Sequence, residues 1–547
     1  MTRRTAALDR NWLVVTILPA LAWAPLLYPG FFQSQSGLAA IYRVSQPATA
    51  GAFFPAAAGE SAPLAWALAG LAHALGLGAA ESVKLVFGLA LLASGLTMYL
   101  AARRLLGRAG GLVAALVYAY LPYVLAVVYA RGSLPEAVAL ALLPLALWAV
   151  DLTSRPVAAV PPTLMARLAL PTLVGTASVL LALAHPGLCL AALPLLLAFG
   201  AYSGGRRAFG LAGLGMVPGA IAALVLLWPL PAGAAPVQAA DLYRLFSPAW
   251  QAGPGETPLQ LGVVAVVLAL LAGSEWFFGH PETDEVAARG TGEEESDQQE
   301  MLAAVGAQSP VAAQPRPAGF FAAATITLLV LMLPPAAPLL WPALHLQAVL
   351  PDPWQLLGLA AMTLSLTAGA ALTGRRWGPM LIERTTLAAL VVAILLASYP
   401  YLAPRNIRAA DLPDPSRAPV ARFEDSILLA DYRIEQPAGA RTVRLTLYWQ
   451  ALALIQGDYT VFTHLLDAQG ARQGQKDAKP LAGARPTATW ARGEVLVDVY
   501  EIALSPQAVA GAYVLELGLY QPEKDRRVPQ MAPQAGATEI RIPVAIR

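Results

Sequence analysis

Cysteine and charge are the two things that this sequence has least of. Its 547 residues include one cysteine, Cys189, so no disulfide can form within the chain, and cysteine usage says nothing about the redox compartment. Only 13% of the residues are charged, whereas soluble proteins average about 25%. Because 57% of the residues are hydrophobic, the composition indicates an integral membrane protein. The net charge of +2 gives no support for a nucleic-acid partner.

Sequence motifs for cofactors and metals are also missing. The chain has no phosphate-binding loop, dinucleotide fingerprint, zinc-ligand spacing or serine-hydrolase elbow in a convincing context. The five histidines, at positions 73, 185, 280, 345 and 464, are scattered. We therefore predict no assigned cofactor and no metal ligands, with a divalent metal ion as the open alternative.

Long apolar runs fill most of the first 400 residues. About eleven of them are long enough to cross a bilayer. They are 12–28, 82–101, 110–129, 135–152, 168–184, 187–203, 210–229, 258–278, 318–340, 355–373 and 386–402. The sequence therefore predicts a polytopic α-helical membrane domain over residues 1–403.

The arginines predict how this domain is oriented. Cytoplasmic loops collect Lys and Arg, and the basic loops all fall on the side of the N-terminus if the apolar, Gly-rich stretch 62–78 does not cross. We therefore predict a cytoplasmic N-terminus and a first outer loop, 29–81, that contains an interfacial helix. The acidic segment 279–317 lacks apolar periodicity, which predicts a disordered cytoplasmic loop.

The composition changes after the last apolar run. Residues 404–418 are rich in Pro, Asp and Arg, as is typical of a linker. Apolar and polar residues then alternate strictly over 442–450, and further β-branched and aromatic runs follow. These runs are 459–466, 495–502 and 513–520. They predict an extracytoplasmic antiparallel β-sandwich over 419–547. We favour a structural or interaction module; the alternative is sugar binding by exposed aromatic residues such as Tyr448.

A few polar residues, from Tyr129 to Glu136, separate two of the predicted spans. Arg131 and Glu136 lie here, where the chain turns at the membrane surface. Ionisable groups near membrane depth are costly, so they tend to be paired, to face a cavity or to be functional. Two interpretations are equally compatible with the sequence: an ordinary ion pair that closes a tight turn, and a functional site.

Three more polar residues lie on the predicted outer side of the membrane, Arg43 in the first outer loop and His185 and Asp352 at the ends of spans. His185, before Pro186, either satisfies a helix end or lines an outer cavity. Arg43 is either a surface residue or, because arginine binds oxyanions with two donors at once, a phosphate ligand. Asp352 precedes Trp354, and tryptophan is typical of the boundary itself.

The order of several short motifs resembles a known family. The motifs are Ile41-Tyr42-Arg43, Met98–Gly107, Val117–Tyr123, Tyr129–Ala137 and Ala182–Pro186. They are similar to those of multi-spanning bacterial membrane proteins labelled 6-pyruvoyl-tetrahydropterin-synthase-related, which resemble GT-C glycosyltransferases. The resemblance covers most of residues 12–400. It implies transfer of a sugar from a polyprenyl-phosphate carrier, for cell-envelope glycans, on the extracytoplasmic side of the plasma (inner) membrane.

The resemblance also implies roles for single residues. Arg43 and Arg131 would hold the phosphate, Glu136 would order Arg131, and His185 and Asp352 would contact the substrate. The acid that the family carries in its first outer loop is replaced here by Gln35-Ser36, and Gln355 replaces an arginine after Trp354. Glu60 and Glu136 are then the candidate catalytic carboxylates.

Because of these replacements, a second function stays open. The protein is either a GT-C-like glycosyltransferase, active or degenerate, or a non-catalytic envelope scaffold that binds lipid or glycan; a transporter is less favoured. The expected partners are membrane lipid and a polyprenyl-phosphate sugar, with a glycan or a protein for the sandwich.

Overall fold

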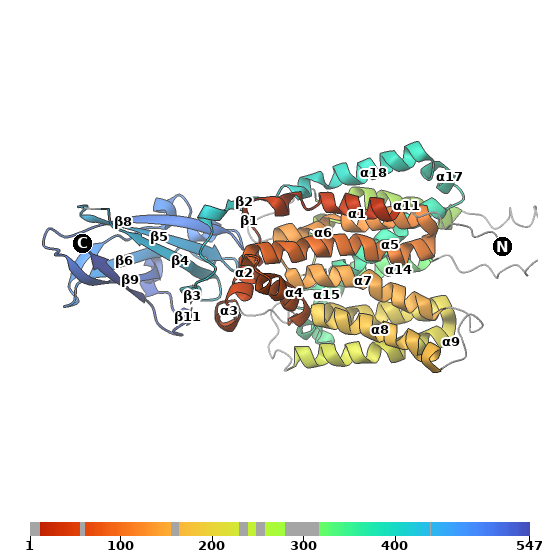
Figure 1. Cartoon of the computed structure of the whole chain (residues 1–547), viewed down its shortest axis with the longest axis horizontal. Coiled ribbons are helices and arrows are strands. Elements are labelled where there is room, and N and C mark those ends of the chain that lie inside the picture. Colours follow the sequence, from red (N-terminus) through yellow and green to blue (C-terminus); the bar gives the residue numbers. More distant parts are fainter. Residues whose placement is uncertain are drawn as a thin grey trace, which may run out of the picture.

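The chain forms two domains that lie end to end (Figure 1). The computed structural model describes residues 11–54, 61–154, 164–228, 239–247, 258–278, 317–437 and 439–547. Long helices make up the first domain, and a β-sandwich makes up the second. Within the described ranges, five helices are long and apolar enough to cross a membrane, or six if one bent pair forms a single span. The predicted polytopic membrane fold is therefore confirmed.

Each of the eleven predicted spans overlaps a helix of the structure. Two long helices, α5 (Ala79–Ala119) and α9 (Pro186–Leu227), each join parts of two predicted spans at a glycine break, at Gly107 in α5 and at Gly204–Gly205 in α9. A Cβ atom on Gly111 would lie 2.6 Å from the Cα atom of Arg103, although residues eight apart in a straight helix are about 12 Å apart. The chain therefore reverses at Gly107. The helices that overlap the predicted spans are α1 (Asn11–Leu21), α5 (Ala79–Ala119), α6 (Pro122–Ala126), η2 (Val127–Arg131), α7 (Leu134–Thr153), α8 (Leu164–Ala184), α9 (Pro186–Leu227), α11 (Val263–Phe278), α14 (Ala318–Met332), α16 (Leu357–Ala370) and α18 (Arg384–Ser398).

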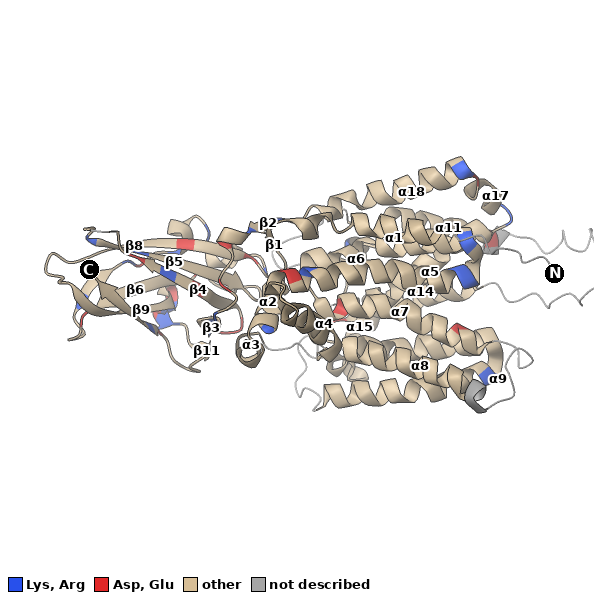
Figure 2. Cartoon of the chain, in the orientation of Figure 1, with Lys and Arg blue, Asp and Glu red and all other residues tan. Residues whose placement is uncertain are grey.

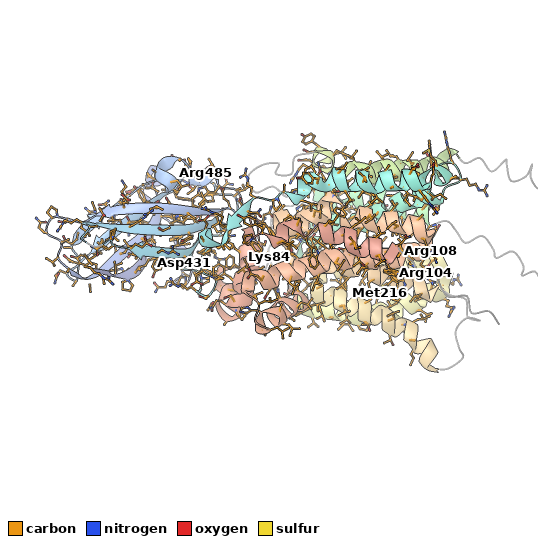
Figure 3. All side chains as sticks on the ribbon, turned by 45° about the horizontal axis from the view of Figure 1, so that its top comes forward. Lys84, Arg104, Arg108, Met216, Asp431 and Arg485 are labelled. Carbon is orange, nitrogen blue, oxygen red and sulfur yellow. The ribbon has the colours of Figure 1, made fainter. Side chains whose placement is uncertain are left out.

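The two ends of the helical domain differ in charge. Figure 2 shows a group of basic residues at the end far from the sandwich, and Figure 3 places Arg104 and Arg108 there. The Arg104 guanidinium donates to the Asp151 carboxylate, and Asn11 of α1 donates to the Arg108 carbonyl at 3.3 Å. The start of α1 therefore lies at the basic end. Cytoplasmic loops collect such residues, so this end is predicted to face the cytoplasm.

The first outer loop lies between the helices and the sandwich. It contains β1 (Gly30–Phe32), α2 (Gly37–Ser45), α3 (Pro47–Phe53) and α4 (Pro63–Ala74). With 12 residues, α4 is too short to cross a bilayer. This length agrees with the interfacial helix predicted for 62–78. Glu60, and the acidic loop 279–317 except for its last residue, lie outside the described residues.

Lys84 is a buried charged residue near the sandwich end of α5 (Figure 3). Its ammonium donates to the carbonyl oxygens of Tyr28 and Gly30, at 3.1 Å each. It therefore holds the start of the first outer loop against α5. We expect Lys84→Met to lower the free energy of unfolding by about 1.5–3 kcal/mol, because hydrogen bonds from a charged donor are lost. Thermal unfolding in detergent would measure this loss.

Glu81→Gln is the matched control for this variant. The Glu81 carboxylate lies 3.7 Å from the Lys84 ammonium, but its side chain is 55% exposed, so we expect a change of about 0–1 kcal/mol. Equal losses in Lys84→Met and Glu81→Gln would contradict the assigned role of the two carbonyl contacts.

The C-terminal domain is an antiparallel β-sandwich, as predicted. Each of its two sheets has five strands, and their inner faces enclose one apolar core. The strand predicted from alternation and the three predicted from β-branched and aromatic runs are all present, as β5, β6, β8 and β9. One sheet contains β11 (Gln530–Ala532), β3 (Ala421–Phe423), β4 (Ile427–Glu435), β5 (Thr442–Ala451) and β8 (Val495–Ala503); the other contains β10 (Arg526–Arg527), β9 (Gly511–Gln521), β6 (Thr460–Leu466), β7 (Arg472–Gln475) and β12 (Ile540–Ile546).

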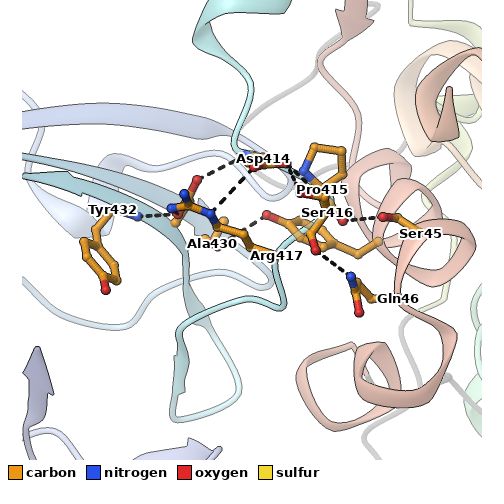
Figure 4. Close-up of polar contacts among 10 residues, drawn as sticks. Ser45, Gln46, Asp414, Pro415, Ser416, Arg417, Ala430 and Tyr432 are labelled. Carbon is orange, nitrogen blue, oxygen red and sulfur yellow. Dashed lines mark hydrogen bonds and ion pairs between the residues drawn. The ribbon is translucent and has the colours of Figure 1, made fainter.

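The sandwich is docked firmly on the first outer loop. β1 pairs with β2 (Asn406–Arg408), which lies in the predicted linker. Figure 4 shows Ser45 donating to the Pro415 carbonyl, and Gln46 to the Ser416 carbonyl, both at 2.5 Å. The segment 404–418 therefore runs along the loop and fixes the sandwich to it.

An apolar interface accompanies these hydrogen bonds. Tyr42, Phe53 and Phe54 from the loop pack with Leu428 and Tyr448 from the sandwich. Burial raises the pKa of Tyr42, and Asp431 and Asp414 add to the shift, so the hydroxyl stays protonated and donates to the Ala430 carbonyl at 3.3 Å. Because Tyr448 is 4% exposed, the suggestion that its ring is an exposed sugar platform is wrong.

Candidate functional site

The Arg131–Glu136 turn forms a buried polar site at the sandwich end of the helical domain. Arg131 ends η2, a π-helical turn, and such turns are frequent at functional sites. Gly132 follows with a φ of 66°, a left-handed conformation that glycine adopts without steric cost. Ser133 then precedes α7, with Pro135 in its first turn, where the missing proline N–H costs nothing. The local sequence therefore dictates a sharp break that brings Arg131 back to Glu136.

Both oxygens of the Glu136 carboxylate accept a hydrogen bond. Arg131 Nη1 donates to Oε2, and Tyr123 Oη donates to Oε1 at 2.5 Å. Glu136 is fully buried and Arg131 is 7% exposed. A buried ion pair of this kind needs such hydrogen bonds to offset the loss of water. The Glu136 carboxylate is therefore well placed to hold Arg131 in position.

The Trp354 ring covers the guanidinium of Arg131. The Arg131 Cζ atom lies 4.4 Å from the ring centroid, a cation–π contact. A guanidinium carries five N–H donors in a planar fork, which suits the oxygens of a phosphate. Glu136 and Trp354 together fix the plane of this fork. Sequence reasoning treated Trp354 as a boundary residue and did not find this contact, because nothing local links positions 131 and 354.

The first outer loop lies directly on the Arg131 turn. The backbone N–H of Gln35 donates to the Ala130 carbonyl at 3.0 Å, and that of Ser36 to the Arg131 carbonyl at 2.7 Å. Gln35 and Ser36 stand where the resemblance predicts an acid. The structure therefore places that position beside Arg131, with an amide and a hydroxyl in place of a carboxylate.

Asp352 and Gln355 close the turn that carries Trp354. The Asp352 N–H lies 3.5 Å from Gln355 Oε1, and the Gln355 N–H donates to the Asp352 carbonyl at 3.1 Å. Asp352 is half-buried. It is next to the Trp354 turn and so belongs to the surroundings of the site, while its contact with a substrate stays a prediction.

His185 and Arg43 both have structural partners. His185 is buried, and its Nδ1 accepts the Leu188 N–H at 3.2 Å as the N-cap of α9. Arg43 donates to the Phe54 carbonyl at 2.6 Å and lies 5.1 Å from the Trp66 ring centroid. These contacts hold the ends of helices and of the loop in place. The roles of both residues in substrate binding stay predictions, as does the catalytic role of Glu60.

An apolar crevice lies next to α6, the short helix that contains Tyr123. Its volume is about 270 Å³, and α5, α6, α10 (Leu242–Phe246), α11 and α18 surround it. Phe246 and Val263 line it and are more than half exposed, so it opens at the apolar outer surface of the bundle. Pro122 lines it as well, and the next residue, Tyr123, donates to Glu136.

Metal ligands are not grouped in the part of the chain that the structure describes. No set of three His, Cys, Asp or Glu side chains there could hold a metal ion. The Arg131 site itself consists of a guanidinium that is paired with a carboxylate and covered by an aromatic ring.

Comparisons with known proteins find only distant structural similarity. No protein-family model matches the chain, and no curated protein matches it. The family resemblance seen in the motifs therefore stays a prediction.

Three solved structures illustrate the similarity. The arabinofuranosyltransferase AftD from Mycobacteria is 17% identical with a TM-score of 0.41, over 73% of this chain and 27% of that one. ArnT from Cupriavidus metallidurans, bound to undecaprenyl phosphate, is 14% identical with a TM-score of 0.39, over 71% and 63%. The Archaeoglobus fulgidus oligosaccharyltransferase is 14% identical with a TM-score of 0.39, over 73% and 57%. The chain spans about a quarter of the length of AftD and less than two thirds of the other two.

Proposed function

We propose that the chain is a GT-C-like membrane glycosyltransferase, active or degenerate, that binds the phosphate of a polyprenyl-linked sugar through Arg131. The buried guanidinium, oriented by Glu136 and covered by Trp354, is the observation that carries this proposal. A charge at membrane depth is costly and is usually retained for a function. The resemblance of the motifs around it to GT-C-like proteins supports the same assignment.

The lipid chain of the carrier would lie in the apolar crevice beside α6. The crevice opens at the outer surface of the bundle, where hydrocarbon is the solvent, and one of its walls is the helix that supplies Tyr123 to Glu136. The basic residues at the other end of the bundle support a cytoplasmic location for that end. The Arg131 site would then face the extracytoplasmic side of the plasma (inner) membrane.

A non-catalytic scaffold that binds the same lipid is the second candidate. Gln35 and Ser36, at the position where an acid is expected, favour it, because neither side chain is a base at neutral pH. Both carboxylate oxygens of Glu136 accept hydrogen bonds, which supports a role for Glu136 in holding Arg131 rather than in proton transfer.

The test is the binding of polyprenyl phosphate in mild detergent, measured by native mass spectrometry. The variant is Arg131→Met/Glu136→Leu, which removes both charges of the pair. We expect its affinity for polyprenyl phosphate to fall about tenfold to a hundredfold, because charge-assisted hydrogen bonds to the phosphate are lost.

Arg104→Met/Asp151→Leu is the matched control. It removes the ion pair at the opposite, basic end of the bundle, and its affinity should equal that of the parent. Equal binding by all three proteins would overturn the proposal. Binding by the parent without sugar transfer from a polyprenyl-phosphate sugar would favour the scaffold, and Ser36→Asp would then test whether an acid restores transfer.

A further inference from the structure

Gly493 of the sandwich touches the first outer loop at the position next to the Arg131 turn. It lies just before β8, with a φ of 80°. A Cβ atom placed on it would lie 2.2 Å from the Ser34 carbonyl oxygen and 2.3 Å from the Gln35 Cα atom. Ordinary contacts of a Cβ atom begin at 3.4 Å. Only glycine therefore allows the two backbones to approach this closely.

The loop is clamped from its other side by the turn of the site itself. A Cβ atom on Gly132 would lie 2.5 Å from Ser34 Oγ and 2.7 Å from the Gly37 backbone nitrogen. The N–H groups of Gln35 and Ser36 donate to the carbonyls of Ala130 and Arg131. Residues 34–37 are thus a single layer of chain between Gly493 and the residue that carries the guanidinium.

The turn that carries Gly493 is itself well anchored in the sandwich. The Gly493 N–H donates to the Ala451 carbonyl at 2.6 Å, and the Ala451 N–H donates to the Glu494 carbonyl at 3.1 Å. The Glu494 carboxylate accepts from Arg485 at 2.6 Å and from the Ala491 N–H at 2.9 Å. A turn held in this way transmits a displacement instead of absorbing it.

We propose that Gly493 is a positioning residue of the Arg131 site, and that the docked sandwich is a structural part of that site instead of a tethered module. The turn Ala491–Glu494 presses residues 34–36 onto the Arg131 turn and so fixes the guanidinium relative to its ligand. The expected loss of polyprenyl-phosphate binding rests on the proposed function, whereas the expected change in amide exchange does not.

The test compares Gly493→Ala with Gly470→Ala in the full chain. Gly470 has nearly the same φ, 78°, but no atom lies within 4 Å of an added Cβ. The control therefore places alanine at a similar positive φ without the collision. Hydrogen exchange followed by mass spectrometry reports the amides of Gln35 and Ser36, and polyprenyl phosphate is the binding probe.

We expect Gly493→Ala to speed amide exchange at Gln35 and Ser36 by about tenfold, the equivalent of one weakened hydrogen bond. Polyprenyl-phosphate affinity should fall by a similar factor, while the amides of β5 and β8 stay protected. Gly470→Ala should match the parent in both readouts. If the sandwich tolerates no substitution at Gly493, Gly132→Ala replaces that variant, because it pushes the same loop from the opposite side. It should then show the faster exchange at Gln35 and Ser36 and the lower affinity expected of Gly493→Ala.

Unchanged exchange at Gln35 and Ser36 in Gly493→Ala, with β5 and β8 protected, would overturn the inference. So would equal effects in Gly493→Ala and Gly470→Ala. Faster exchange in Gly493→Ala, together with a parent protein that does not bind polyprenyl phosphate, would uphold the coupling and reject the proposed function.

Discussion

Replacing Glu136 by alanine is expected to lower the free energy of unfolding of the helical domain by about 3–5 kcal/mol. The variant leaves the buried Arg131 guanidinium without its carboxylate, and the Tyr123 hydroxyl without its acceptor. Both groups are buried and would be poorly hydrated without these partners, since Tyr123 is fully buried and Arg131 is 7% exposed. Thermal unfolding of the purified protein in detergent, followed by the helical circular dichroism signal, would measure the loss.

The double variant Arg131→Met/Glu136→Leu is the control that separates the ion pair from packing. Replacing both members of a buried pair by apolar residues of similar size is often close to neutral. We therefore expect the double variant to unfold near the parent temperature while it loses phosphate binding. A double variant as unstable as Glu136→Ala would show that the pair is needed for the fold, and would weaken the case that it is retained for binding.

Replacing Trp490 by alanine is expected to cost about 3–5 kcal/mol in the sandwich, the usual range for removing a buried aromatic side chain. The ring is fully buried, lies 6.4 Å from the Trp449 ring, and its Nε1 donates to the Arg485 carbonyl at 3.1 Å. Trp490 directly precedes the turn of Gly493. We therefore expect the loss to be accompanied by faster amide exchange at Gln35 and Ser36.

Val509→Ala is the control for Trp490→Ala, because Val509 is 71% exposed and a surface substitution usually changes stability by less than about 0.5 kcal/mol. Hydrogen exchange of β5 and β8 would report the stability of the sandwich. Protection of these strands in Trp490→Ala at the level of Val509→Ala would contradict the prediction.

The sandwich changes how the first outer loop should be viewed. A loop of this composition, rich in Ala and Gly, would be expected to be mobile if it faced only water. Here the loop is held between two domains by β1–β2 pairing, by the contacts of Ser45 and Gln46, and by the apolar contacts of Tyr42. The position of the expected acid is therefore rigid, which makes Ser36→Asp an informative substitution.

Much of the architecture could be predicted from the sequence. Apolar runs of bilayer length and their separation by basic loops depend on local composition, and the helices overlap them because helix hydrogen bonds are local. Strand β5 was predicted because alternation is also a local pattern, and β6, β8 and β9 were predicted from local runs of β-branched and aromatic residues. Strand β4 was missed; its first five residues are all buried, so it lacks the alternation.

The outer face of β5 shows where local patterns stopped being informative. Alternation correctly placed Val443, Leu445, Leu447 and Trp449 in the core. On the opposite face Tyr448 is also buried, because α2 and α3 pack against it. The sequence of the strand itself does not indicate that α2 and α3 pack against it.

The sequence by itself determined that this is a polytopic membrane protein with a C-terminal β-sandwich, and that Arg131 and Glu136 lie at a turn between two spans. Only the tertiary structure decided what surrounds that pair: Tyr123 on the carboxylate, Trp354 over the guanidinium, and residues 34–36 held in place by Gly493. Hydrophobic runs and alternation reflect short-range geometry along one segment. These contacts join segments that are far apart in the chain, and they depend on how helices and sheets pack together.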